Sequence, residues 1–139
     1  MKISTKGRYG LRVMLDLAVY GENSYVSLTE VAKRQKVSLK YLESIISSLK
    51  NGGLVLSTRG KSGGYKLSKN PAEYTVGEIL KAAEGNLAPV SCLGEGVDCP
   101  HADKCLSLPV WEGLDKIIDE YLENITLEQV LTKKVGIDG

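Results

Sequence analysis

A chain of 139 residues, 42% of them hydrophobic, is long enough for one small domain with a modest core, or for such a domain plus a helical extension. No apolar run approaches the ~18 residues of a membrane span, and the start lacks the apolar stretch of a signal peptide, so we expect a cytoplasmic protein without a membrane partner. The net charge of +1 is unevenly distributed. Residues 1–70 contain 13 lysines and arginines and 4 acidic residues, whereas residues 71–139 contain 5 lysines and arginines and 13 acidic residues. This asymmetry indicates that the basic half binds a polyanion.

Three helices are predicted in the basic half. Residues 5–20 carry apolar side chains at helical spacing. A second, short helix ends near residue 35 and begins at a capping box of Ser27 and Glu30, whose side chains satisfy free amides of the first turn. A third helix, 39–51, has one apolar face and ends at a pair of glycines. Two short helices joined by a tight turn indicate a helix-turn-helix.

A β-hairpin is predicted directly after the third helix, because the apolar pattern changes from helical spacing to alternation. Residues 54–58 and 64–68 alternate around the glycine-rich turn RGKSG. A hairpin in this place is a wing. The turn contains GKS, but a phosphate-binding loop needs an earlier glycine where this sequence has Val55, so we do not expect nucleotide binding.

The acidic half is predicted to hold three more helices, interrupted by the segment that contains the cysteines. A capping box at 75–78 begins a helix that Gly85 ends. A long helix starts at Pro109 and runs to about residue 124, and a last short helix starts at residue 126. The long helix has a wide apolar face, which a second copy of the chain would cover in a two-fold dimer.

The predicted fold class is therefore mainly α with a small β-hairpin, arranged as a winged helix-turn-helix domain plus a long dimerisation helix. Residues 1–85 form the DNA-binding domain, residues 86–108 a cysteine-rich loop, and residues 109–139 the dimerisation helix with the short C-terminal helix. A homodimer would set its two recognition helices about 34 Å apart, one turn of DNA. This predicts a palindromic operator in double-stranded DNA.

The third helix is the candidate recognition helix, because N-terminal side chains of such a helix reach base edges in the major groove. Glu43 would accept from a cytosine amine, and Arg59, at the wing tip, would enter a narrow minor groove, where the negative potential is strongest. The predicted DNA-binding residues are Ser38, Lys40, Tyr41, Glu43, Ser44, Arg59 and Lys61. Phosphate contacts are expected from Lys2, Lys6, Arg8, Lys33, Arg34, Lys36, Lys61 and Lys66.

All three cysteines and the only histidine lie in CLGEGVDCPHADKC, residues 92–105. Three cysteines cannot all pair within one chain, and a disulfide framework is not expected in a reducing cytoplasm. The spacing C-x6-C-x5-C lacks the C-x2-C knuckle of structural zinc sites, whereas iron–sulfur clusters accept wider spacings. These residues favour a metal or cluster site; a thiol redox switch and inert cysteines stay open as alternatives.

The sequence resembles a known family over nearly its whole length. The matching runs are STKGRYG at the start, SLKYLE in the third helix, GLVLSTRGKSGGYKL through the wing, the cysteine segment ending DKCL, and NITLEQV near the end. They resemble the iron–sulfur cluster regulators of the IscR type, which are bacterial winged-helix repressors. The resemblance implies a homodimeric, DNA-binding transcription regulator that holds a 2Fe–2S cluster, senses cluster supply and controls genes of cluster assembly. It also suggests cluster-assembly scaffold proteins as partners.

The resemblance implies functions for individual residues as well. Cys92, Cys99 and Cys105 match the thiolate ligands of the cluster. Glu43 matches a carboxylate of the recognition helix that helps to decide which promoters are read. Arg59 matches the wing arginine that enters the minor groove.

The fourth cluster ligand is where this chain departs from the family. The family has a histidine three residues after the last cysteine, and this chain has Leu108 there, which cannot bind iron. The candidate replacement is His101; the further options are an external thiol, Asp98, Asp103 and Glu43. An incomplete set of protein ligands predicts a labile, oxygen-sensitive cluster.

Two other functions compete with this one. A cluster-free regulator of cysteine or sulfur metabolism would respond through thiols or through a partner enzyme, although related regulators of this kind lack the three cysteines. A small iron–sulfur electron carrier would have no need of a wing or a basic half. An enzyme is not expected, because the sequence contains no recognisable nucleophile–base or acid–base pair.

Overall fold

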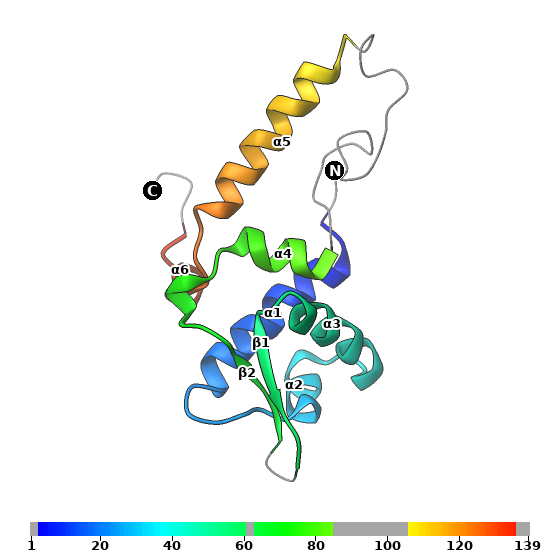
Figure 1. The fold of residues 1–139 in the computed structure, drawn as a ribbon, viewed down its shortest axis with the longest axis vertical. Helices are drawn as coiled ribbons and strands as arrows, with labels where there is room; N and C mark the ends of the chain where they lie inside the picture. Colours follow the sequence, from blue (N-terminus) through cyan, green and yellow to red (C-terminus); the bar gives the residue numbers. More distant parts are fainter. Residues whose placement is uncertain (1–2, 61–62, 85–105, 136–139) are drawn as a thin grey trace.

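The computed structural model describes residues 3–60, 63–84 and 106–135. Its elements, in chain order, are α1 (Thr5–Tyr20), α2 (Leu28–Gln35), α3 (Leu39–Asn51), β1 (Val55–Thr58), β2 (Gly64–Leu67), the 3-10 turn η1 (Pro71–Glu73), α4 (Val76–Glu84), α5 (Leu108–Glu123) and α6 (Leu127–Leu131). Figure 1 shows α1 to α4 and the hairpin as one body, from which α5 projects. The predicted fold class, mainly α with a small hairpin, is confirmed.

The helices begin at side chains that cap them. Ser4 accepts from the Gly7 amide at 3.3 Å and Ser38 from the Tyr41 amide at 3.1 Å, so that α1 and α3 begin where the sequence predicts. Ser27 accepts from the Glu30 amide at 3.3 Å, which is one half of the predicted capping box. The long helix α5 begins at Leu108, one residue before the predicted start.

The core surrounds α1, which packs against α2, α3, α4 and β2. Its fully buried side chains are aliphatic for the most part and include Val13, Met14, Leu17, Leu42, Ile45, Leu49 and Ile79. Gly10 allows α1 and α4 to approach closely, because a Cβ at this position would lie 2.8 Å from the Cβ of Ala83. None of the helices in the described part of the chain is long and apolar enough to cross a membrane.

The hairpin is joined on one side by a third stretch of chain that the sequence does not predict. Val55 pairs with Leu67 in the antiparallel register, and Val26 forms an isolated bridge with Tyr65. The Val26 amide donates to the Tyr65 carbonyl at 2.8 Å, and the Tyr65 amide donates back at 2.9 Å. A Cβ on Gly64 would lie 2.2 Å from the Val26 carbonyl oxygen, so this close approach requires glycine.

The base of α5 is fixed to the body by backbone and side-chain bonds. The Val76 amide donates to the Ile125 carbonyl at 2.8 Å, and the Leu127 amide donates to the Tyr74 carbonyl at 3.0 Å. Lys81 of α4 donates to Asp119 of α5 and, at 3.2 Å, to Glu123. The hydrogen bond that Lys81 donates to Asp119 raises the pKa of Lys81, so this ion pair persists at neutral pH and is lost only as the pH rises through the raised pKa.

A buried carboxylate holds α2 against α1. Asp16 is 4% exposed and accepts two bonds from Arg34, Nε to Oδ2 at 2.9 Å and Nη2 to Oδ1 at 2.8 Å. The side-chain amide of Gln35 donates from Nε2 to the same carboxylate at 3.0 Å, and the Arg34 guanidinium lies 3.9 Å from the centre of the Tyr20 ring. This ion pair therefore helps to fix α2 against α1.

We expect Arg34→Met to lower the free energy of unfolding by about 3 kcal/mol, because the Asp16 carboxylate stays buried without its main partner. Chemical denaturation at neutral pH measures this loss. The matched control is Lys33→Met on the exposed side of α2, which should change stability by less than about 0.5 kcal/mol. Equal stabilities of the two variants would contradict a structural function of the pair.

Candidate nucleic-acid interface

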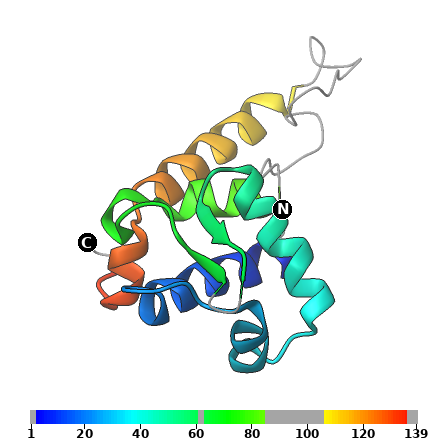
Figure 2. The ribbon, with the colours of Figure 1, turned by 60° about the horizontal axis from the view of Figure 1, so that its bottom comes forward.

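A helix-turn-helix and a wing lie at the end of the body that is opposite α5 (Figure 1). Lys36 ends α2 in the left-handed conformation, with φ of 56° and ψ of 46°, and Ser38 caps α3 two residues later. The connection is therefore tight, and Leu42 and Val31 are buried between the helices and the core. Figure 2, in which this end comes forward, shows the hairpin in the middle, with α2 at the bottom and α3 at the right.

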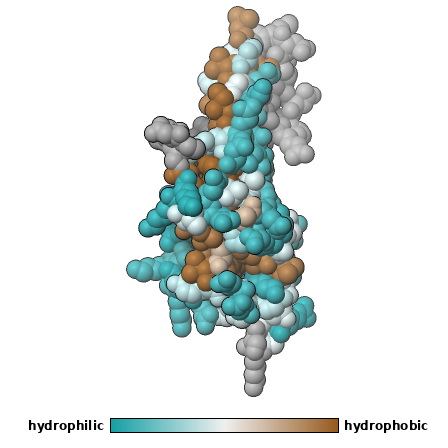
Figure 3. Space-filling view, turned by 90° about the vertical axis from the view of Figure 1, so that its left-hand side faces the viewer, coloured by the Kyte–Doolittle hydropathy of each residue, from teal (hydrophilic) through white to brown (hydrophobic). Residues whose placement is uncertain are grey.

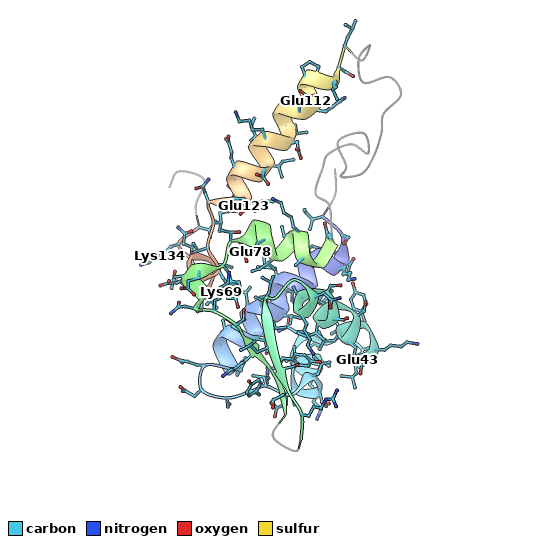
Figure 4. The ribbon with its side chains drawn as sticks, in the orientation of Figure 1. Glu43, Lys69, Glu78, Glu112, Glu123 and Lys134 are labelled. Carbon is cyan, nitrogen blue, oxygen red and sulfur yellow. The ribbon has the colours of Figure 1, made fainter. Side chains whose placement is uncertain are left out.

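The outward face of α3 is polar apart from Leu39 at its start, which is 43% exposed. Lys40, Glu43 and Ser44 are exposed, whereas Leu42, Ile45, Ile46 and Leu49 on the opposite face are buried. Figure 4 shows Glu43 at the outer side of the helix. Ser47 continues this exposed face by one turn, and the sequence interpretation did not include it; its spacing from Glu43 and Ser44 is the signal that could have found it.

Two of the predicted DNA-binding residues also hold α3 in place. Ser38 uses its hydroxyl to cap the helix. Tyr41 is half-buried and meets Tyr9 of α1 edge to face, with the ring centres 6.1 Å apart and an interplanar angle of 84°. Arg12 lies over the other ring of this pair, 4.7 Å from the centre of Tyr9. These contacts fix the orientation in which α3 presents Lys40 and Glu43.

The positive charges around α3 divide into exposed and engaged groups. Arg59 is exposed after β1, next to Gly60, whose φ of 106° suits a glycine. Of the residues predicted to contact phosphate, Arg34 is bound to Asp16, and Lys66 lies 4.8 Å from the centre of the Tyr25 ring. Exposed cations among the described residues of the basic half are Arg8, Arg12, Lys33, Lys36, Lys40, Lys50, Arg59 and Lys69. Lys2 and Lys61 lie outside the described residues.

Six candidate cluster ligands lie outside the described residues: Cys92, Cys99, Cys105, His101, Asp98 and Asp103; the seventh, Glu43, is exposed on α3. The described part of the chain contains no group of three or more His, Cys, Asp or Glu side chains that could hold a metal. Both ends of the cysteine segment attach to described elements. Glu84, the last residue of α4, accepts from the Ser4 amide at the start of α1. Leu108, half-buried, is the first residue of α5.

The outer face of α5 is apolar and uncovered. Val110, Leu114, Ile117 and Tyr121 are 62%, 39%, 65% and 53% exposed, and they follow one another at intervals of four, three and four residues. We call these four side chains the α5 seam. Figure 3 shows hydrophobic surface along the projecting part of the molecule. The spacing is that of the contact line between two packed helices.

Comparisons with known proteins agree with this architecture. The model of the Rrf2 family, described as iron-dependent transcriptional regulators, matches residues 3–133. A helix-turn-helix-type transcriptional regulator of Neisseria meningitidis serogroup A is 39% identical over 139 residues, which cover 100% of this chain and 93% of that protein.

Two solved structures are similar over nearly the whole chain. The T. potens IscR structure is 38% identical with a TM-score of 0.75, covering 97% of this chain and 89% of that one. The structure of CymR, described as the global cysteine regulator of B. subtilis, is also 38% identical, with a TM-score of 0.72 and coverage of 96% and 98%. These relatives are regulators of transcription, which agrees with the expectation that the chain is not an enzyme.

Proposed function

Because the chain belongs to the Rrf2 family of transcriptional regulators, we propose that it acts in the cytoplasm as a homodimeric repressor whose promoter choice is switched by an iron–sulfur cluster. Its targets would be genes of cluster assembly, and scaffold proteins of that pathway would deliver or remove the cluster. The observation that carries the proposal is the exposed polar face of α3 beside the wing arginine, at the end of the body opposite an apolar α5 seam.

In this proposal α3 enters the major groove and the wing lies along the adjacent minor groove. Glu43 accepts from a cytosine amine and rejects sites without a donor there, because its charge would be desolvated against the DNA without a partner. Lys40 binds phosphate or guanine, and Arg59 enters a narrow minor groove. Ser38 and Tyr41 contribute by holding α3 in orientation.

The α5 seam supports a two-fold dimer. Four exposed apolar side chains in coiled-coil spacing would be covered by the same helix of a second copy. The bonds from α4 and from residues 74–76 to the base of α5 would transmit the geometry of that dimer to both winged bodies. The two α3 helices would then meet half-sites about 34 Å apart.

The donor set of the chain fits an iron–sulfur cluster in part. Three thiolates, Cys92, Cys99 and Cys105, would hold it, and the half-buried hydrocarbon of Leu108 offers no fourth ligand at the position where the family has a histidine. His101 is our candidate for that ligand. A bound cluster would supply a centre sensitive to oxygen and to iron supply. The protein would couple the cluster to the position of its helices, because the segment that carries the thiolates connects Glu84, which is bound at the start of α1, with the first turn of α5.

A second candidate function is regulation of cysteine or sulfur metabolism without a cluster, through the thiols or a partner enzyme. The similarity to CymR, described as a global cysteine regulator, favours it. The two functions share the DNA-binding body and the α5 seam, and they differ in what the three cysteines do. Iron and sulfide content therefore distinguishes them.

We expect Glu43→Ala to bind DNA but to lose discrimination at one base pair of each half-site. The cost of the wrong base should fall by about 1–3 kcal/mol, because the charge that rejects it is absent. Competition binding with single-base variants of a duplex, selected by the wild-type protein from a random library, measures this. Ser47→Ala, on the same exposed face, is the control. Unchanged discrimination in Glu43→Ala would remove this function from Glu43.

The cluster is tested by anaerobic purification, absorption spectroscopy and analysis of iron and sulfide. We expect the wild type to contain both in equal amounts and Cys99→Ser to lose them. In His101→Ala, loss of the cluster would identify His101 as the fourth ligand, and retention would direct attention to Asp98, Asp103, Glu43 or an external thiol. A colourless wild-type protein, with or without zinc, would contradict the cluster and leave the cysteine regulator.

A further inference from the structure

A buried tyrosine connects the wing with the base of α5. Tyr74 lies between η1 and α4, is 0% exposed and is among the largest fully buried side chains of the described residues. Its backbone carbonyl accepts from the Leu127 amide at 3.0 Å, at the start of α6. Its side chain contacts the base of the hairpin, at Leu54 and Ser68. One residue therefore contacts both the part of the molecule that supports α5 and the part that carries Arg59.

The hydroxyl of Tyr74 closes the base of the hairpin. It donates to the Leu54 carbonyl at 2.7 Å and accepts from the amides of Ser68 at 2.8 Å and Lys69 at 2.9 Å. Leu54 directly precedes β1, and Ser68 directly follows β2. The Ser68 amide also donates directly to the Leu54 carbonyl at 3.3 Å, and the hydroxyl strengthens this junction and extends it to Lys69.

The hydroxyl is buried, and its neighbour Ser68 extends the contact to the end of α3. The Ser68 Oγ lies 3.0 Å from it and donates to the Gly53 carbonyl at 2.9 Å, just after α3. Lys69 Nζ lies 4.8 Å from the centre of the Tyr74 ring and 3.3 Å from Glu78 of α4. Figure 4 shows Lys69 and Glu78 close together beside the hairpin. A phenylalanine would fill the same volume, so packing alone does not account for a hydroxyl with this many partners.

We propose that Tyr74 is a positioning residue for DNA recognition, whose hydroxyl fixes the wing relative to α3 and to the base of α5. The inference rests on the proposed function, because it concerns how Arg59 reaches the minor groove. Without the hydroxyl, the Lys69 amide loses its partner, and the Ser68 amide and the Leu54 carbonyl keep only their mutual bond of 3.3 Å, so the wing gains freedom. DNA binding must then order the wing, which weakens the wing contact and leaves the contacts of α3 unchanged.

A double-mutant cycle tests this inference. Tyr74→Phe, Arg59→Ala and the double variant are compared on the library-selected duplex, and on the same duplex with G·C pairs in the flank that the wing covers. We expect Arg59→Ala to lose about tenfold in affinity and Tyr74→Phe about fivefold. In the Arg59→Ala background, and on the G·C flank, Tyr74→Phe should change affinity less than about twofold.

Controls separate positioning from general loss of structure. Tyr20→Phe removes the hydroxyl of a tyrosine that is 56% exposed on α1, and it should bind as the wild type does. The folded fraction of every variant is measured by chemical denaturation, and affinities are corrected for it. If Tyr74→Phe fails to fold, Ser68→Ala removes one of the same contacts, and the same dependence on Arg59 should appear with a smaller loss.

The outcomes have different consequences. A loss in Tyr74→Phe that is equal in both backgrounds would make Tyr74 a purely structural residue and overturn the inference, while the proposed DNA contacts stand. An unchanged affinity of Tyr74→Phe would overturn it as well. An unchanged affinity of Arg59→Ala would remove the wing contact from the proposed function, and the positioning of Arg59 by Tyr74 with it.

Discussion

Two backbone hydrogen bonds connect the winged body with the base of α5, the helix that projects from it. They join residues 74–76 to residues 125–127, at 2.8 Å and 3.0 Å, and they fix the base of α5 against the winged body. Lys81, which is bonded to Asp119 and Glu123, holds the next turns of α5 in the same relation. The direction in which α5 presents its apolar seam is thereby fixed relative to α3. A dimer built on that seam would set the two DNA-reading helices at one separation.

The winged body has the rigidity that this arrangement requires. Asp16 and Arg34 fix α2 to α1, Tyr41 and Tyr9 fix α3 to α1, and the hydroxyl of Tyr74 fixes the base of the hairpin. Each of these contacts places a polar or aromatic group between two elements. Such a geometrically specific interaction determines the angle between the two elements better than aliphatic packing alone. The exposed side chains that would meet DNA, Lys40 and Glu43, are thus carried on a supported surface.

The sequence predicts the helices of this fold well, and the reason is local. Ser4, Ser27 and Ser38 each cap a helix through an amide three residues away, and apolar residues at helical spacing face the core. The hairpin is predicted by alternation around a glycine-rich turn for the same reason. The exposed face of α3 follows from the position of the apolar face opposite to it.

The contacts that assemble these elements were not predictable, because they join residues that are distant in the sequence. From the sequence Arg34 is expected to bind phosphate, but in the fold it binds Asp16, which lies 18 residues earlier. Tyr74 lies between the predicted hairpin and the next predicted helix, and its hydroxyl bonds to Leu54, 20 residues earlier. An acidic residue within the inward face of α1 was the available signal for a buried pair. The bridge between Val26 and Tyr65 has no local signal except the glycine that follows the turn.

A dimer built on the α5 seam would read two half-sites of DNA at one fixed separation. The most direct measurement is the affinity for the selected duplex before and after insertion of five base pairs between its half-sites, which turns one half-site to the opposite side of the DNA. Because the helical repeat of B-DNA is about 10.5 base pairs, we expect the affinity to fall to that of a single half-site. An affinity that the insertion leaves unchanged would contradict a fixed separation of the two α3 helices.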